Sequence, residues 1–320
     1  MQLIEELREF DAVFSKMSPV EQTLRISPNM LNEMQRKKDR LRELQSTLGW
    51  SQDTVHNKLH EITWDSTAAS RQSRHSSGEK ISDAMRAHML AVAQWAVAGG
   101  PNPGHNTDPH LTSPNNESRR KRYILDVGCG TGLLCEYIQK AQMKSLSISS
   151  PSSLNNSKKK KSANSNSQSP SDSNCHVIGV DFSGEMIKIA KTNYPQSTFV
   201  LSDFLQFSLP DEVPEVDCIV FNESLHNFLD IKAALLHAKN LLLVSPSSST
   251  PSSVGKKIVI SNPKGFAGIV KQHAVNRWLC PHLLPNDQEL SALANELNME
   301  VVQRPDIQSA HYLAVLAIGQ

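Results

Sequence analysis

The sequence predicts an α/β fold built on a doubly wound, mostly parallel sheet and preceded by a helical extension. Three observations support this prediction. The apolar run 123–127 ends at a glycine-rich turn and is followed by a helical pattern, which is typical of a buried parallel strand. Further apolar runs of strand length alternate with amphipathic helical patterns downstream. Residues 1–98 lack strand patterns and repeat apolar residues every three or four positions.

The turn after the first strand carries the most informative motif. Residues 123–132 read Tyr-Ile-Leu-Asp-Val-Gly-Cys-Gly-Thr-Gly. A dinucleotide fingerprint requires a glycine where Leu133 stands, and a P-loop requires a Gly-Lys-Ser/Thr that is missing here. The turn therefore suits a ligand that lacks a pyrophosphate, unless it is only a tight strand-to-helix turn of another α/β protein.

The pattern Asp-x-Gly-x-Gly-x-Gly resembles motif I of the class I S-adenosylmethionine-dependent methyltransferases. The resemblance implies S-adenosyl-L-methionine as cofactor and a seven-stranded sheet whose last strand is antiparallel. It also implies that Asp126 attracts the cofactor's ammonium group, and that amides at the helix start suit its carboxylate. The cofactor-binding residues implied by this motif are Asp126, Gly128, Cys129, Gly130 and Gly132.

A second strand at 176–181 ends in Asp181. The resemblance implies that Asp181 accepts hydrogen bonds from the two ribose hydroxyls of the cofactor and that Phe182 also contacts the cofactor. Asp181 lies 55 residues after Asp126, which is too far for this fold. The Ser-, Asn- and Lys-rich tract 144–174 cannot build a core, and without its 31 residues the spacing is 24. We therefore expect a disordered insertion there, and Ser183 as the cap of the next helix.

The remaining patterns complete the family's order of elements. Strands are expected at 197–201, 216–221, 256–261, 299–302 and 312–317, and helices at 231–243 and 286–298. By its position after the third strand, Asp203 inherits the role of accepting the adenine amino group, unless it is a solvated loop residue. Asn222, at the end of the fourth strand, is also expected at the cofactor. The Pro-His-Leu-Leu-Pro segment 281–285 resembles uncharacterised plant and algal methyltransferases.

The methyl acceptor is expected near the end of the fourth strand. Glu223 and His226 are three residues apart, so a helical turn would place them on one face. We expect His226 to titrate near neutrality and to act as general base, oriented by Glu223. The alternative is that His226 and Asn227 only shape the pocket wall.

Exclusion favours a small-molecule acceptor. The fourth strand is not followed by the Asn/Asp-Pro-Pro-Tyr/Phe of adenine-amino and glutamine methyltransferases, and Cys218 lies within the strand rather than beyond it. The alternatives are a protein or RNA methyltransferase that grips its substrate with the N-terminal helices, and a cofactor-binding interaction protein without catalysis.

Composition agrees with a cytoplasmic enzyme, with a nuclear location as the alternative. The net charge of +1 does not indicate a basic surface for nucleic acid, and the basic runs 119–122 and 158–161 are short and isolated. Five cysteines, an odd number, favour reduced thiols, and neither a signal segment nor a membrane segment is expected. We expect no metal, because Cys280, His273 and His282 lack zinc spacing. The oligomeric state is not predicted.

The domain organisation follows from these patterns. We expect a helical N-terminal extension or lid at 1–98, a linker at 99–122, and the methyltransferase domain at 123–320 with disordered insertions at 144–174 and 245–254. Ser51 and Ser82 are candidate caps of the last two helices of the extension. The polar stretch 64–78 is a candidate mobile lid.

Overall fold

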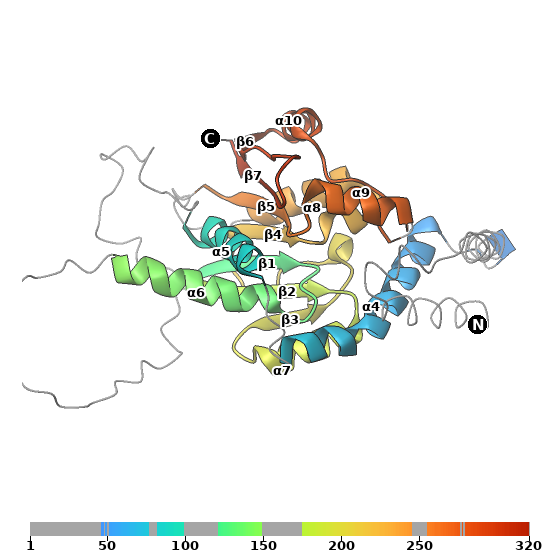
Figure 1. Cartoon of the computed structure of the whole chain (residues 1–320), viewed down its shortest axis with the longest axis horizontal. Coiled ribbons are helices and arrows are strands. Elements are labelled where there is room, and N and C mark those ends of the chain that lie inside the picture. Colours follow the sequence, from blue (N-terminus) through green and yellow to red (C-terminus); the bar gives the residue numbers. More distant parts are fainter. Residues whose placement is uncertain are drawn as a thin grey trace, which may run out of the picture.

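A computed structural model gives the arrangement of the chain (Figure 1). It describes residues 51–76, 82–98, 121–148, 175–244, 255–275 and 279–319, together with residues 46, 47, 49 and 277. The apolar repeats before residue 46, nearly all of the expected linker, residues 149–174 and the insertion 245–254 lie outside the described residues. Within the described part of the chain, no helix is both long and apolar enough to cross a membrane.

A seven-stranded sheet forms the centre of the molecule. Its strands are β1 (Arg122–Val127), β2 (Cys175–Asp181), β3 (Thr198–Leu201), β4 (Cys218–Asn222), β5 (Lys257–Asn262), β6 (Met299–Gln303) and β7 (Tyr312–Ile318). The strand order is β3-β2-β1-β4-β5-β7-β6, and β1 to β5 run parallel. β7 lies antiparallel to both of its neighbours. The expected fold class is confirmed.

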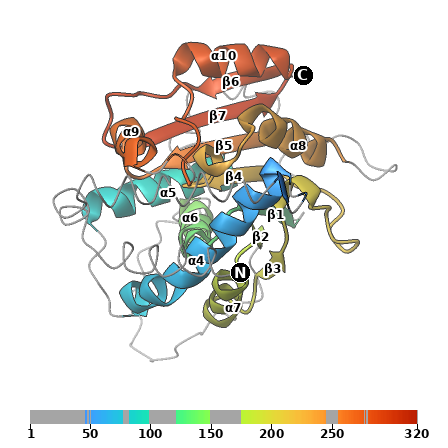
Figure 2. The ribbon, with the colours of Figure 1, turned by 90° about the vertical axis from the view of Figure 1, so that its right-hand side faces the viewer.

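Helices cover both faces of the sheet (Figures 1 and 2). The described helices are α4 (Gln52–Ser76), α5 (Asp83–Ala98), α6 (Leu133–Ile148), α7 (Gly184–Asn193), α8 (Ile231–Leu243), α9 (Gly265–Val275) and α10 (Asp287–Glu296), with short 3-10 turns at Phe204–Gln206 and Leu225–Asn227. Successive residues of β1 point to opposite faces, so Ile124 belongs to the core cluster that contains residues of α5 and α6, and Leu125 to the cluster that contains residues of α8 and α10. Both side chains are fully buried, which explains why the strand is continuously apolar.

Three serines cap helices as expected. The hydroxyl of Ser51 accepts the amide of Thr54, and the hydroxyl of Ser82 accepts that of Met85. Ser183 begins α7 in the same way. Each bond satisfies a helix N–H that has no intrahelical partner.

Two boundaries differ from expectation. The stretch from Trp64 was expected to be a polar lid segment, but α4 continues without interruption to Ser76. The disordered tract was expected from Lys144, but α6 continues to Ile148. The residues Met143, Lys144, Leu146 and Ile148 accept a helical backbone readily, and a serine-rich composition alone does not stop a helix that has already nucleated.

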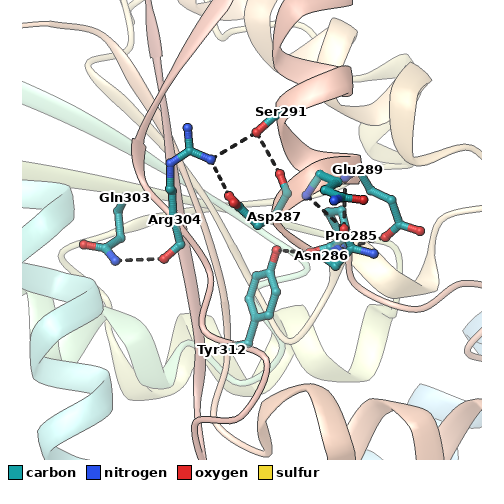
Figure 3. Close-up of polar contacts among 9 residues, drawn as sticks. Pro285, Asn286, Asp287, Glu289, Ser291, Gln303, Arg304 and Tyr312 are labelled. Atoms are coloured by element: carbon teal, nitrogen blue, oxygen red, sulfur yellow. Dashed lines mark hydrogen bonds and ion pairs between the residues drawn. The ribbon is translucent and has the colours of Figure 1, made fainter.

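The C-terminal hairpin is fastened to α10 by polar contacts (Figure 3). Asn286 and Glu289 form a capping box at the start of α10. The hydroxyl of the fully buried Tyr312 donates to the carbonyl of Pro285 over 2.8 Å. Arg304 pairs with Asp287 over 2.6 Å. These bonds hold the segment that follows α9 against β7, close to the end of β5.

Candidate active site

A cavity of about 850 Å³ lies at the carboxyl ends of the parallel strands. This is the edge where open α/β sheets bind ligands. The cavity is lined by residues 126–131 after β1, 180–182 after β2, 202–206 after β3, 222–224 after β4, and one face of α4. Nine of the expected site residues line it: Asp126, Gly128, Cys129, Gly130, Asp181, Phe182, Asp203, Asn222 and Glu223.

The glycine turn is shaped by close contacts. Gly128 has φ +69°, and a Cβ there would lie 2.7 Å from Cβ of Ser224, so the loop after β4 can approach only a glycine. At Gly130 a Cβ would meet nothing within 4 Å, so this backbone faces open space. Gly132 does not line the cavity; a Cβ there would lie 2.8 Å from the ring of Tyr194, so packing explains this glycine.

Most amides of the glycine turn itself are engaged within the protein, whereas those of Thr131, Leu133 and Leu134 at the helix start form no hydrogen bond with a described residue. The amides of Gly128 and Cys129 donate to the carbonyl of Val180, and that of Gly132 donates to the carbonyl of Cys129. The amide of Gly130 donates to Oδ2 of Asp181 over 2.9 Å. The neutral amides of Thr131, Leu133 and Leu134, which line the cavity, are the ones left for a ligand carboxylate.

Asp181 is fixed at the end of β2 by two backbone bonds. Its Oδ2 accepts from Gly130, and its Oδ1 accepts the amide of Ser183 over 2.9 Å. Burial raises the pKa of Asp181, against the lowering effect of the two hydrogen bonds. Each carboxylate oxygen can accept a further hydrogen bond, which fits a pair of neighbouring hydroxyls.

Asp126 is a buried carboxylate that lacks a partner. It is 2% exposed, and no described residue donates a hydrogen bond to it. Burial, followed by the charge of Asp181, raises its pKa to about 7. A carboxylate in this state favours a cationic ligand, and an ammonium group fits this position.

Asp203 and Asn222 are each oriented by a neighbour. Oδ1 of Asp203 accepts the amide of Leu205, and Oδ2 accepts the side-chain amide of Asn57 over 2.8 Å. The hydroxyl of Ser261 donates to Oδ1 of Asn222 over 2.7 Å. Asn222 lines the cavity, and its side-chain N–H groups form no hydrogen bond with a described residue.

Cysteine chemistry is not favoured at this site. Burial, reinforced by Asp181 and Asp126, raises the pKa of Cys129 well above its ordinary value, so its sulfur is a thiol and not a nucleophilic thiolate. Away from the cavity, Nδ1 of His273 donates to the carbonyl of Cys280. The imidazole of His273 is therefore engaged within the protein.

Glu223 stands in a strained position on the cavity wall. It has φ +59°, a left-handed conformation that is uncommon for residues with a side chain. Its Oε1 lies 3.4 Å from Nζ of Lys264, which also lines the cavity. Burial raises the pKa of Glu223, but the charges of Lys264 and Arg71 outweigh burial and leave that pKa below its ordinary value. Glu223 is therefore ionised at neutral pH.

His226 does not have the expected setting. It is 5% exposed and is absent from the cavity lining, and its Nδ1 has no hydrogen-bond partner among the described residues. Burial lowers its pKa to about 4, so the expectation that it titrates near neutrality is wrong. The expected shared helical face is wrong as well, because the 3-10 turn begins at Leu225 and Glu223 precedes it.

The sequence predicted a helical extension or lid before the first strand, but not which residues of α4 reach the cavity. One face of this helix lines the cavity with Asp53, Asn57, His60, Trp64 and Arg71. The spacings of four, three, four and seven residues match successive helical turns, so a polar stripe beside the apolar stripe was the available signal.

α4 is fastened beside this cavity and lies along α7 (Figure 2). The hydroxyl of Ser183 donates to Asp65 over 2.6 Å, and the side chains of Gln72 and Asn193 exchange two hydrogen bonds. At the other end of the helix, Nε2 of His56 donates to the carbonyl of Asn227 over 2.8 Å. α4 is therefore tied to the segments after β2 and β4.

One family of proteins matches part of the chain. Residues 107–246 match the family described as "Methyltransferase domain". A search of curated protein sequences found no match.

Among solved structures, the chain is similar to magnesium protoporphyrin IX methyltransferase from Synechocystis PCC 6803 with bound SAH. That comparison has 11% identity, a TM-score of 0.49, and coverage of 82% of this chain and 100% of the other. It is also similar to the plantazolicin methyltransferase BpumL in complex with SAH, with 15% identity, a TM-score of 0.47, and coverage of 88% and 99%.

The fold, the site and the family match together define the class of protein. A doubly wound sheet carries the acids and the glycine turn at one cavity, and this region matches a methyltransferase domain. The chain is an S-adenosylmethionine-dependent methyltransferase. The residues present fit the cofactor, since Asp126 lacks a cationic partner and Gly130 leaves open space beside the turn.

Proposed function

We propose that this methyltransferase transfers the methyl group to a small molecule that enters the cavity beneath α4. The size and covering of the cavity carry this proposal. A volume of about 850 Å³ lies within the range of small-molecule sites, roughly 300 to 1,000 Å³. Trp64 of α4 and Met85 and Met89 of α5 add apolar walls to the polar edge of the sheet. Such walls suit a compact acceptor better than a protein or RNA surface.

On this proposal, the acids along the sheet edge hold the cofactor. Asp126 faces the ammonium group, Asp181 the ribose, and Asp203 the adenine amino group, with Phe182 and Asn222 beside them. S-adenosylmethionine, when bound, supplies an electrophilic methyl group on a sulfonium. The protein then has to align the acceptor atom with that methyl group and, for a neutral acceptor, remove a proton.

We assign the acceptor side to Glu223. It lines the cavity, is ionised, and is held in a strained backbone conformation, a feature that concentrates at functional sites. Its carboxylate can accept the proton of an acceptor hydroxyl or amine. His226 lies behind the cavity wall and acts as a positioning residue for the loop after β4, so the roles expected from the sequence are exchanged.

Two further attributes belong to the proposal. All five cysteines are free thiols in the structure, which suits a reducing compartment such as the cytoplasm or nucleus. The segment 281–285 is bound to β7 by the hydrogen bond from Tyr312 to the carbonyl of Pro285. We propose that the same bond holds this turn in the plant and algal methyltransferases that the Pro-His-Leu-Leu-Pro segment resembles.

The acceptor class is tested with methyl-tritiated S-adenosylmethionine. The protein is incubated with an extract of its source cells, which is then separated into small molecules, protein and RNA. We expect label in the small-molecule fraction with the wild-type protein. Label in protein or RNA instead would overturn the acceptor class, and no label despite measured cofactor binding would overturn catalysis.

Once the acceptor is known, two variants separate the roles. We expect Glu223→Gln to lower kcat about 100-fold or more without changing cofactor affinity. We expect His226→Asn to change KM and kcat less than tenfold, with the same pH profile as the wild type. A larger loss in His226→Asn that alters the pH profile would return the general-base role to His226.

A further inference from the structure

The charges on the cavity wall are unbalanced. The described lining contains five carboxylates, on Asp53, Asp126, Asp181, Asp203 and Glu223, and two permanent cations, on Arg71 and Lys264. Lys264 is paired with Glu223. Arg71 forms no ion pair with any described residue, so it is the free cation of the described cavity wall.

Arg71 is nevertheless held in place. Its guanidinium carbon lies 4.7 Å from the centre of the Trp64 ring, a cation–π arrangement that orients the planar group. The next residue, Gln72, exchanges two hydrogen bonds with Asn193 of α7, which fixes this part of α4. Arg71 lines the cavity, and its charge lowers the pKa of both Asp181 and Glu223.

The cofactor brings one negative charge that the neutral amides of the glycine turn cannot balance. Its amino-acid half carries an ammonium and a carboxylate. Asp126 suits the ammonium, but the amides of Gly128, Cys129, Gly130 and Gly132 are engaged within the protein. A carboxylate that has only neutral donors and no cationic partner, in a cavity rich in acids, would be strongly disfavoured.

We infer that Arg71 of α4 binds the carboxylate of the cofactor's methionine half. This inference rests on the proposed function and adds to it a residue that decides which donor is accepted. A guanidinium presents two parallel N–H groups that match a carboxylate. The bond also joins α4 to the bound donor, so α4 recognises an intact amino-acid half and not only the adenosine.

The test compares two probes, S-adenosylhomocysteine and its decarboxylated analogue, which lacks only the carboxylate. We expect the wild-type protein to bind S-adenosylhomocysteine about 10- to 50-fold more tightly, by calorimetry with competition for the weaker ligand. Arg71→Ala should bind S-adenosylhomocysteine as weakly as its decarboxylated analogue, and the affinity for the analogue should stay at the wild-type value. Arg71→Lys, which keeps the charge but not the fork, should retain an intermediate preference.

Lys58→Ala is the matched control, because Lys58 lies on the same helix, is 46% exposed and pairs only with Glu61 among the described residues. It should leave both affinities unchanged. If Arg71→Ala raises the Kd for both probes by the same factor, Arg71 has a structural role and the inference fails. If Arg71→Ala leaves both Kd values unchanged, the inference fails as well, because the carboxylate is then bound elsewhere. If the wild-type protein binds neither probe, the proposed function itself falls, which is a separate result.

Discussion

Replacing Asp126 by Asn should stabilise the protein without ligand and weaken its binding of the cofactor. Asp126 is 2% exposed, and burial with the charge of Asp181 raises its pKa to about 7. The pKa is about 3.8 in the unfolded chain. Because the folded value is the higher one, ionisation of Asp126 opposes folding, and this penalty grows as the pH rises from about 4 to about 7.

The difference of about three pKa units corresponds to roughly 4 kcal/mol at pH 8. The asparagine amide is also buried and loses part of this gain, so we expect a net increase of about 1 to 3 kcal/mol in the free energy of unfolding. Urea unfolding measures this change. The variant should gain less at pH 5, where Asp126 is mostly neutral in the folded wild type.

Cofactor binding should be weakened by Asp126→Asn, although the free energy of unfolding increases. The ammonium of the cofactor favours ionised Asp126, whose population falls from about nine-tenths at pH 8 to about one-tenth at pH 6. The Kd of the wild-type protein for S-adenosylhomocysteine should therefore rise about tenfold over that range, and the Kd of Asp126→Asn should stay flat.

The control is Asp217→Asn. Asp217 is also buried, but its carboxylate already has a partner, the amide of Tyr123 at 2.8 Å, so this change should bring no comparable gain in stability. A loss of stability in Asp126→Asn at pH 8, or a pH-independent Kd in the wild type, would refute the reasoning.

Two further predictions follow from the same site. Asp181→Ala should cost about 1.5 to 3 kcal/mol of cofactor binding, measured by calorimetry, since it removes a charged acceptor of two hydroxyls; an unchanged Kd would contradict that role. Replacing residues 149–174 by a short Gly/Ser linker, which keeps α6 intact to Ile148, should leave the melting temperature and cofactor affinity nearly unchanged, because loop closure depends only weakly on length, about 0.6 kcal/mol per halving. A large fall in either quantity would show that the tract is structural.

The strands could be predicted because burial on both faces leaves little freedom of composition. The runs around Ile124, Val177 and Ile219 are continuously apolar, since alternate side chains meet helices on opposite faces. The acids at their ends followed from the strand positions once the serine-rich tract was set aside. Helix ends were harder to predict, because α6 extends to Ile148 through good helix formers that stand among the serines of the polar tract.

The part of the site contributed by α4 could not be placed from the sequence alone. Its polar stripe was visible, but a polar stripe is also what a solvent-facing helix shows. What aims Asn57 and Arg71 at the cavity is the docking of α4, through Asp65 to Ser183 and Gln72 to Asn193. These contacts join positions more than 100 residues apart, and periodicity carries no information about them.

The positions of Glu223 on the cavity wall and His226 in the core, on which the proposed exchange of roles rests, have a local cause. A spacing of three residues places two side chains on one face only if the backbone between them is helical. Here β4 extends to Asn222, and Glu223 then takes a left-handed conformation that turns the chain before the 3-10 turn begins. Gly128 is what allows that loop to approach the glycine turn, with Ser224 directly against it. One close backbone contact thus brings Glu223 to the cavity and moves His226 into the core, and a sequence that preserves both residues but replaces Gly128 would lose the arrangement.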